Sequence, residues 1–112
     1  MITNVLVFAI AAFFEIAGCF AFWLWLRRGA SFSVAVLGVA SLISFAVALT
    51  RIDSAFAGRA YAAYGGIYIG ASLVWLWLVE GQRPKATDVI GASIAIVGAL
   101  IIISFAARNQ GP

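Results

Sequence analysis

Four long apolar stretches, separated by short polar segments, make up most of this sequence. They run over residues 2–26, 33–49, 60–79 and 89–107. A helix needs roughly 20 apolar residues to cross the hydrocarbon core of a bilayer. Of the 112 residues 65% are hydrophobic and only 10% are charged, which is far fewer charges than the roughly 25% of a soluble domain. The pattern predicts an all-α membrane protein, with residues 1–112 forming a single domain of four transmembrane helices joined by short loops and surrounded by lipid.

The side chains that most enzymes and metal sites use are scarce here. The sequence has no histidine and one cysteine, Cys19, which lies inside the first apolar stretch. Zinc and thiol sites need more of these ligands, and no set of nucleophile and base is present. The seven basic residues lie at the ends of the stretches and form no basic stripe for nucleic acid. We therefore expect no enzyme activity, no metal or other cofactor, and no nucleic-acid partner.

Glu15 differs from the other charged residues because it lies near the centre of the first stretch. Acidic residues within membranes are costly and usually face a cavity in which ions or protons move. Neighbouring positions on the helix are mostly small, and we expect Gly18 to line such a cavity. Desolvation favours the neutral carboxyl group, so a proton and a cationic guest would compete for Glu15, which is sufficient for antiport. The alternative is that a protonated Glu15 only holds helices together.

The third stretch presents two different faces when its residues are placed on a helix. One face carries three tyrosines and two further candidates for a cavity wall, and the other carries small residues spaced for close helix contact. Aromatic rings attract cations, and tyrosine hydroxyls can donate to a carboxylate. We therefore predict that the tyrosines bind proton or substrate together with Glu15, although an aromatic belt at the membrane surface is the alternative. The tyrosines are Tyr61, Tyr64 and Tyr68, the wall candidates are Ser72 and Trp75, and the small residues are Ala62, Gly66 and Gly70.

Two further sets of residues complete the predicted site and assembly. Arg59 precedes the aromatic face and is a candidate gate or counter-charge, unless it only extends toward the lipid headgroups. Gly91, Ala95 and Gly98 form a narrow seam on the fourth stretch, which otherwise has few polar residues. Such a seam is a packing surface. We assign it to a contact between two copies of the chain, and packing within one copy is the alternative.

The basic residues are divided almost evenly between the two sides of the membrane that four spans define. Arg51, Arg59 and Arg108 fall on one side, and Arg27, Arg28, Arg83 and Lys85 fall on the other. An excess of Lys and Arg on one side normally fixes the orientation of a membrane protein. The near tie predicts dual topology, in which the chain inserts both ways up.

The two halves of the sequence carry a weak repeat. Residues 18–26 and 70–78 both end in Trp-Leu-Trp-Leu, and Gly29 and Gly81 lie at equivalent positions after them. Each half would then form one helical hairpin. The alternative is that tryptophan pairs recur because they suit the membrane interface.

Three segments of the sequence resemble the bacterial YnfA (UPF0060) family. They are Glu-Ile-Ala-Gly at 15–18, Arg-Ala-Tyr-Ala-Ala-Tyr-Gly-Gly-Ile-Tyr at 59–68, and Trp-Leu-Trp-Leu-Val-Glu-Gly at 75–81. The resemblance runs nearly end to end, and the segment at 59–68 makes it specific. This family is usually placed near the small multidrug resistance transporters, which share the four helices, the first-helix Glu and an aromatic third helix. The sequence also has their Gly-Gln-Arg loop, at 81–83, and their spaced glycines in the fourth helix.

The resemblance implies a function and an assembly. It implies a proton-coupled efflux antiporter of small organic cations or cationic drugs in the bacterial inner membrane, built as an antiparallel homodimer. Glu15 would take the proton and substrate role, Tyr61 matches a tyrosine of those sites, and Tyr64 falls where the drug exporters carry Trp. The competing class of function is a non-transporting structural or accessory membrane subunit, in which Glu15 only joins helices.

Overall fold

The computed structural model describes residues 2–108 and does not describe Met1 or residues 109–112. The described part consists of four helices and the segments that connect them. The helices are α1 (Ile2–Arg28), α2 (Phe32–Leu49), α3 (Ala57–Leu78) and α4 (Ala86–Arg108). All four are long and apolar enough to cross a membrane, so the predicted four-helix membrane fold is confirmed. α3 and α4 each begin three residues earlier than the apolar stretches predict. At α4 the reason is a cap, because the Asp88 carboxylate accepts a hydrogen bond of 2.9 Å from the Lys85 backbone N–H.

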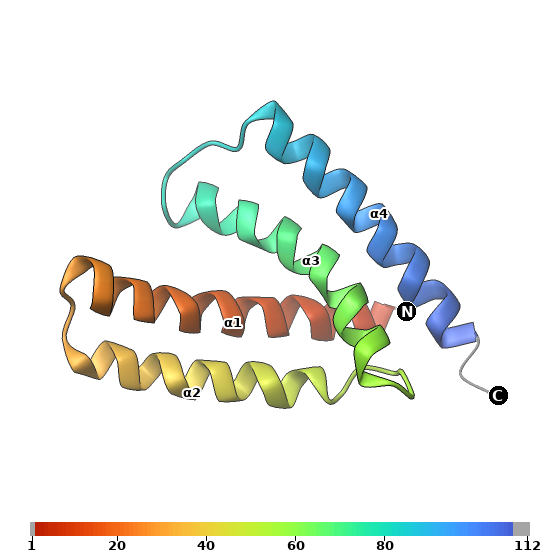
Figure 1. Cartoon of the computed structure of the whole chain (residues 1–112), viewed down its shortest axis with the longest axis horizontal. Helices are drawn as coiled ribbons and strands as arrows, with labels where there is room; N and C mark the ends of the chain where they lie inside the picture. The colour runs from red at the N-terminus through yellow and green to blue at the C-terminus, as the bar shows by residue number, and fades with distance from the viewer. Residues whose placement is uncertain (1, 109–112) are drawn as a thin grey trace.

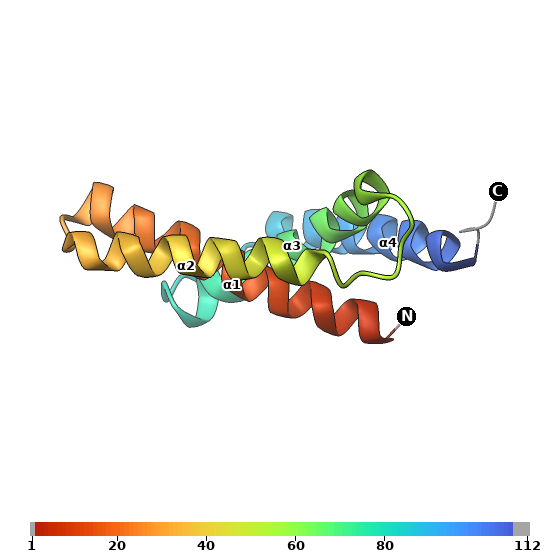
Figure 2. The ribbon, with the colours of Figure 1, turned by 90° about the horizontal axis from the view of Figure 1, so that it is seen from below.

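The helices form two antiparallel hairpins, which meet where α3 crosses α1 (Figure 1). α2 runs along α1, and α4 runs along α3 on the side away from α1. The chain measures 50 × 33 × 19 Å, and Figure 2 shows the flat arrangement edge-on. A helix with its side chains is about 10–12 Å across. The single chain is therefore an open layer of helices that does not close around an interior.

Two glycines bring α1 and α2 into close contact. A Cβ added at Gly18 would lie 2.9 Å from the carbonyl oxygen of Gly38, and one added at Gly38 would lie 2.9 Å from the Cβ of Ala21. The Ser41 hydroxyl also donates a hydrogen bond of 2.6 Å to the carbonyl oxygen of Phe14. We expected Gly18 to line a cavity. It lies instead where α1 and α2 pack closely, and this contact requires a residue without a side chain.

The small face of α3 packs against α4 in the same way. A Cβ added at Gly66 would lie 2.5 Å from both the carbonyl oxygen of Ala95 and the Cβ of Ala99. One turn further along, a Cβ at Gly70 would lie 3.0 Å from the side chain of Ile96. The backbones of α3 and α4 therefore approach within a distance that larger residues at these positions would prevent.

The two hairpin turns share one backbone geometry, as the sequence repeat predicts for equivalent segments. Gly29 and Gly81 both have a positive φ, 72° and 73°, which favours glycine because it has no Cβ. In the first turn the Ala30 N–H donates to the Leu24 carbonyl oxygen, and in the second the Gln82 N–H donates to that of Leu76, at 3.0 and 2.9 Å. The repeat thus extends from side-chain pattern to the way in which each hairpin turns.

The α1–α3 contact contains the most deeply buried side chains of the molecule. Phe8, Ala11 and Ala12 of α1 are fully buried, and they face Ala63 and Tyr64 of α3, which are also buried. The small alanines let α3 approach α1 just before Glu15. This packing places the two functional faces predicted from the sequence against each other.

We predict that Gly66→Ala lowers the free energy of unfolding by about 1–3 kcal/mol, because the new methyl group overlaps α4. Gly65→Ala is the matched control, since a Cβ at Gly65 meets nothing within 4 Å. It should leave stability unchanged or raise it slightly, because alanine is the better helix former. Thermal unfolding in detergent micelles measures both. Equal behaviour of the two variants would contradict the close α3–α4 contact.

Candidate functional site

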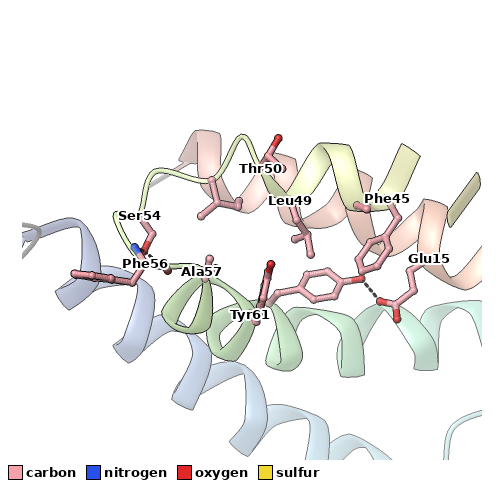
Figure 3. A pocket seen from close by; sticks show the side chains of 12 residues that line it. Glu15, Phe45, Leu49, Thr50, Ser54, Phe56, Ala57 and Tyr61 are labelled. Atoms are coloured by element: carbon pink, nitrogen blue, oxygen red, sulfur yellow. Dashed lines mark hydrogen bonds between the residues drawn. The ribbon is translucent and has the colours of Figure 1, made fainter. Parts of the chain in front are cut away.

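A cavity of about 570 Å³ extends from Glu15 to the loop between α2 and α3. Its walls come from the middle of α1, the end of α2, the 50–56 loop and the start of α3 (Figure 3). Within the described part of the chain, Glu15 is the one charged residue among those that line it. The lining residues are Glu15, Phe45, Ala46, Leu49, Thr50, Ile52, Ser54, Phe56, Ala57, Ala60, Tyr61 and Tyr64. A volume of this size suits a small organic molecule, because ligand pockets commonly span about 300–1,000 Å³.

Glu15 is held by one hydrogen bond from α3. The Tyr64 hydroxyl donates to Glu15 Oε1 across 2.6 Å, and Figure 3 shows this bond as the dashed line at the Glu15 carboxyl group. The second carboxyl oxygen, Oε2, accepts no hydrogen bond from the described residues. The carboxyl group is therefore oriented from one side and remains open to a proton or a guest from the cavity.

The Tyr64 ring is positioned by aromatic contacts with three helices. Its centroid lies 5.8 Å from that of Phe8 on α1, 5.6 Å from that of Phe45 on α2, and 5.9 Å from that of Tyr68 on α3. These separations fall in the range that favours tilted aromatic pairs. The ring is 7% exposed, so its hydroxyl has little freedom to leave Glu15.

The loop that closes one end of the cavity was not predicted from the sequence as part of the site. Ile52 is buried beneath it, and the Asp53 backbone N–H donates a hydrogen bond of 2.9 Å to Asn4 Oδ1. Asn4 is only 3% exposed and lies in the first turn of α1. Glu15 was selected because it is a polar residue inside an apolar stretch. The same criterion applies to Asn4 and would have identified it as a candidate anchor for this loop.

Tyr61 and Arg59 lie toward the edge of the cavity. Tyr61 lines it but is 57% exposed, so this ring forms an outer wall. Arg59 is exposed and does not line the cavity, although its Cζ lies 5.8 Å from the ring centroid of Phe56, which does. A cation–π contact of this kind couples Arg59 to the cavity through Phe56.

The remaining wall candidates do not line the cavity at Glu15. Tyr68 and Trp75 line a second cavity between α1 and the end of α3. The Ser72 hydroxyl donates to the Tyr68 carbonyl oxygen across 2.8 Å within α3, and Ser72 does not line the cavity at Glu15. The structure thus divides the predicted site, because Tyr61 and Tyr64 line the cavity at Glu15 and Tyr68 and Trp75 line the second cavity.

The three residues of the predicted dimer seam have different surroundings. A Cβ at Gly91 or Gly98 would meet nothing within 4 Å, so both positions lie on an unoccupied face of α4. Ala95 instead faces α3, because its carbonyl oxygen lies against Gly66. Packing within the chain, the alternative considered for this seam, therefore accounts for Ala95 but not for the two glycines.

The geometry combines one acid with aromatic walls in a largely apolar cavity. An ionised Glu15 would attract a monovalent cation, and the rings of Phe45, Tyr61 and Tyr64 would stabilise the same charge through their quadrupoles. A protonated Glu15 would remove most of that attraction. The site can therefore hold either a proton or an organic cation.

Comparisons with known proteins agree on one family. The family model described as "Uncharacterised BCR, YnfA/UPF0060 family" matches residues 1–109. A "UPF0060 membrane protein" of Pseudomonas syringae pv. syringae (strain B728a) is 56% identical over 100 residues, covering 89% of this chain and 91% of its own. Another of that name, from Ectopseudomonas mendocina (strain ymp), is 55% identical over 106 residues, covering 95% and 96%. No solved structure matches the chain.

We predict that Tyr64→Phe leaves the fold intact but removes the hydrogen bond to Glu15. The phenyl ring keeps the three aromatic contacts, so stability should fall by only about 1 kcal/mol. In the infrared spectrum, the band of the Glu15 carboxyl group is identified by its disappearance in Glu15→Gln. This band should shift in Tyr64→Phe, because the Glu15 carboxyl group loses its hydrogen-bond donor. Tyr61→Phe is the control, since Tyr61 lines the same cavity but does not bond Glu15. A band that moves equally in both variants would contradict the assignment.

Proposed function

Because the chain belongs to the YnfA/UPF0060 family of membrane proteins, as its sequence predicts, we propose that it is a proton-coupled antiporter of small organic cations. The proposal places it in the bacterial inner membrane, where it would move cations or cationic drugs outward in exchange for protons. Glu15 would be the shared binding group for both. Tyr64 would orient it, and Tyr61 would form part of the cation's aromatic wall.

The observation that carries this proposal is the position of Glu15 in the cavity. Glu15 is at the midpoint of α1, which runs from Ile2 to Arg28, and so would lie near the middle of the bilayer. Among the described residues, it is the one charged residue that lines a cavity reaching the α2–α3 loop, on one side of the membrane. Ionisable residues at this depth usually serve a pathway for ions or protons, and a cavity large enough for a guest is what such a pathway needs.

Coupling follows from competition at one carboxyl group. A cation binds when Glu15 is ionised, and a proton displaces it by neutralising the charge. If the cavity opens to the two sides of the membrane in turn, each cycle carries a cation one way and protons the other.

The alternative function is a non-transporting accessory subunit, and one observation favours it. The Tyr64–Glu15 hydrogen bond joins α1 to α3, which is what a purely structural glutamate would do. Both proposals place Glu15 in the same contact. They differ in whether the cavity beside it takes a cation and whether protons then move.

We predict that proteoliposomes acidified inside accumulate ethidium through this protein, and that Glu15→Gln reduces uptake to the level of empty vesicles. The glutamine oxygen can still accept from Tyr64, so assembly should be retained while proton exchange is lost. Asp88→Asn removes an equal charge at the start of α4, outside the cavity, and should transport normally. Uptake that ignores the pH gradient, or persists in Glu15→Gln, would exclude the antiport mechanism.

We further propose that the working unit is a homodimer of oppositely oriented copies. A flat layer only 19 Å thick cannot enclose a pathway by itself, and the face of α4 that bears Gly91 and Gly98 is unoccupied. The near tie of basic residues permits both orientations. Opposed copies supply the inverted symmetry that many transporters encode within one chain.

Cysteine cross-linking tests the contact and the orientation together. With Cys19 replaced by Ala, Gly98→Cys should form an intermolecular disulfide, because it lies near the middle of α4, where antiparallel helices meet themselves. Gly91→Cys should form no disulfide. At a rise of 1.5 Å per residue, the two copies of this position would lie roughly 18 Å apart along antiparallel helices, whereas a disulfide joins Cα atoms that are within about 7 Å of each other. If both variants cross-link, the two copies are parallel. If neither does, the two copies meet at a different surface.

A further inference from the structure

We propose that the chain has a second cation-binding site, separate from Glu15, in the cavity between α1 and the end of α3. This cavity has a volume of about 180 Å³. Four aromatic side chains and one acid line it, namely Phe20, Trp23, Tyr68, Trp75 and Glu80. The inference goes beyond antiport at Glu15, because it assigns a ligand to a cavity that Glu15 does not line, although its helix neighbours Ile16 and Cys19 do.

The aromatic lining has the composition of a site for an organic ammonium ion. Aromatic faces attract cations, and cages built from several rings are a recurrent way to bind quaternary ammonium groups. Two of the rings already contact cations of the chain itself. The Cζ of Arg27 lies 4.5 Å from the ring centroid of Trp23, and that of Arg28 lies 5.8 Å from that of Phe20. These rings are therefore accessible to positive charge.

Glu80 supplies the negative charge that an aromatic cage alone lacks. It lies two residues after the end of α3 and is exposed at the edge of the cavity, so it can reach a bound ammonium without being buried as an unpaired charge. Arg27 and Arg28 oppose a guest, since they are positive and occupy two of the rings. A guest must displace or share them, which makes the site selective for cations that prefer aromatic faces to water.

The Trp75 ring is held in the wall by packing alone. Its centroid lies 5.5 Å from that of Phe20 and 6.4 Å from that of Phe13. Its indole N–H is buried and donates to no atom of the described residues. Because no hydrogen bond fixes the indole, a change in its orientation on binding a guest would break none.

The size and position of the cavity define the ligand and its relation to Glu15. A volume of about 180 Å³ suits a compact monovalent ammonium such as choline. The Tyr68 ring contacts that of Tyr64 at 5.9 Å, and Tyr64 bonds Glu15. Each of the two cavities is thus lined by one member of this tyrosine pair. The cavity at Glu15 reaches the α2–α3 loop, and the second cavity lies toward the α1–α2 and α3–α4 turns. In a protein with four membrane spans, these turns lie on the opposite side of the membrane from the α2–α3 loop.

Tryptophan fluorescence distinguishes the second cavity from the cavity at Glu15. Because Trp75 also lines two further cavities, the Glu80 variant below assigns the response to the second cavity. Trp23 and Trp75 line it, and no tryptophan lines the cavity at Glu15. A Trp25→Phe, Trp77→Phe background leaves only these two indoles. Choline should change their emission saturably, and its neutral isostere dimethylbutanol, in which carbon replaces the charged nitrogen, should not.

Three variants in this background identify the site. Glu80→Gln should weaken choline binding roughly fivefold, as expected for loss of one partly exposed ion pair. Asp88→Asn, which removes an equal charge outside the cavity, should bind like the parent. Arg28→Gln should bind choline more tightly, because a competing cation is removed.

Several results would overturn the proposal. They are the absence of a saturable response to choline, an equal response to dimethylbutanol, and unchanged binding in Glu80→Gln. Weaker binding in Arg28→Gln would also overturn it, because it would mean that the arginines hold an anionic headgroup there. Glu15→Gln should keep a saturable response to choline, because Glu15 does not line this cavity. A failure of antiport at Glu15 can therefore be told apart from a failure of the second site.

Discussion

The hydrogen bond from Tyr64 to Glu15 connects every part of this structure that bears on function. It joins α1 of one hairpin to α3 of the other, and the ring that donates it is packed by aromatic side chains from α1, α2 and α3. An acid within a membrane needs a polar partner or a proton. The fold supplies one donor to Glu15 and places its carboxyl group at a cavity.

Small residues make that geometry attainable. Ala11 and Ala12 let α3 approach α1, Gly18 and Gly38 bring α2 against α1, and Gly66 brings α4 against α3. Helices in a membrane gain little from hiding apolar surface, because lipid is apolar too, so close packing at small residues holds them together. These contacts support a thin layer of helices, in which the cavity at Glu15 is bounded by one chain and completed, in our proposal, by a second.

The sequence was sufficient to predict the helices and the choice of Glu15, Tyr61 and Tyr64 as neighbours, because hydropathy and helical spacing are local properties. It could not predict the α2–α3 loop as a cavity wall, since that depends on the bond between Asn4 and Asp53, which are distant in the chain. Nor could spacing separate Tyr68 from Tyr64. They lie one turn apart on one helix face, and only the packing of α3 against the other helices assigns them to different cavities.

The central claim is that a proton and a cation compete for Glu15, and the pH dependence of cation affinity tests it most directly. Tetraphenylphosphonium is a suitable cation because it is too large for the second cavity. In the pH range where Glu15 of the free protein is protonated, its affinity for the purified protein should fall about tenfold for each pH unit of acidification, because each bound cation displaces one proton. Glu15→Gln should lose this dependence. An affinity for the parent protein that stays constant across pH, or a slope that persists in Glu15→Gln, would contradict the account.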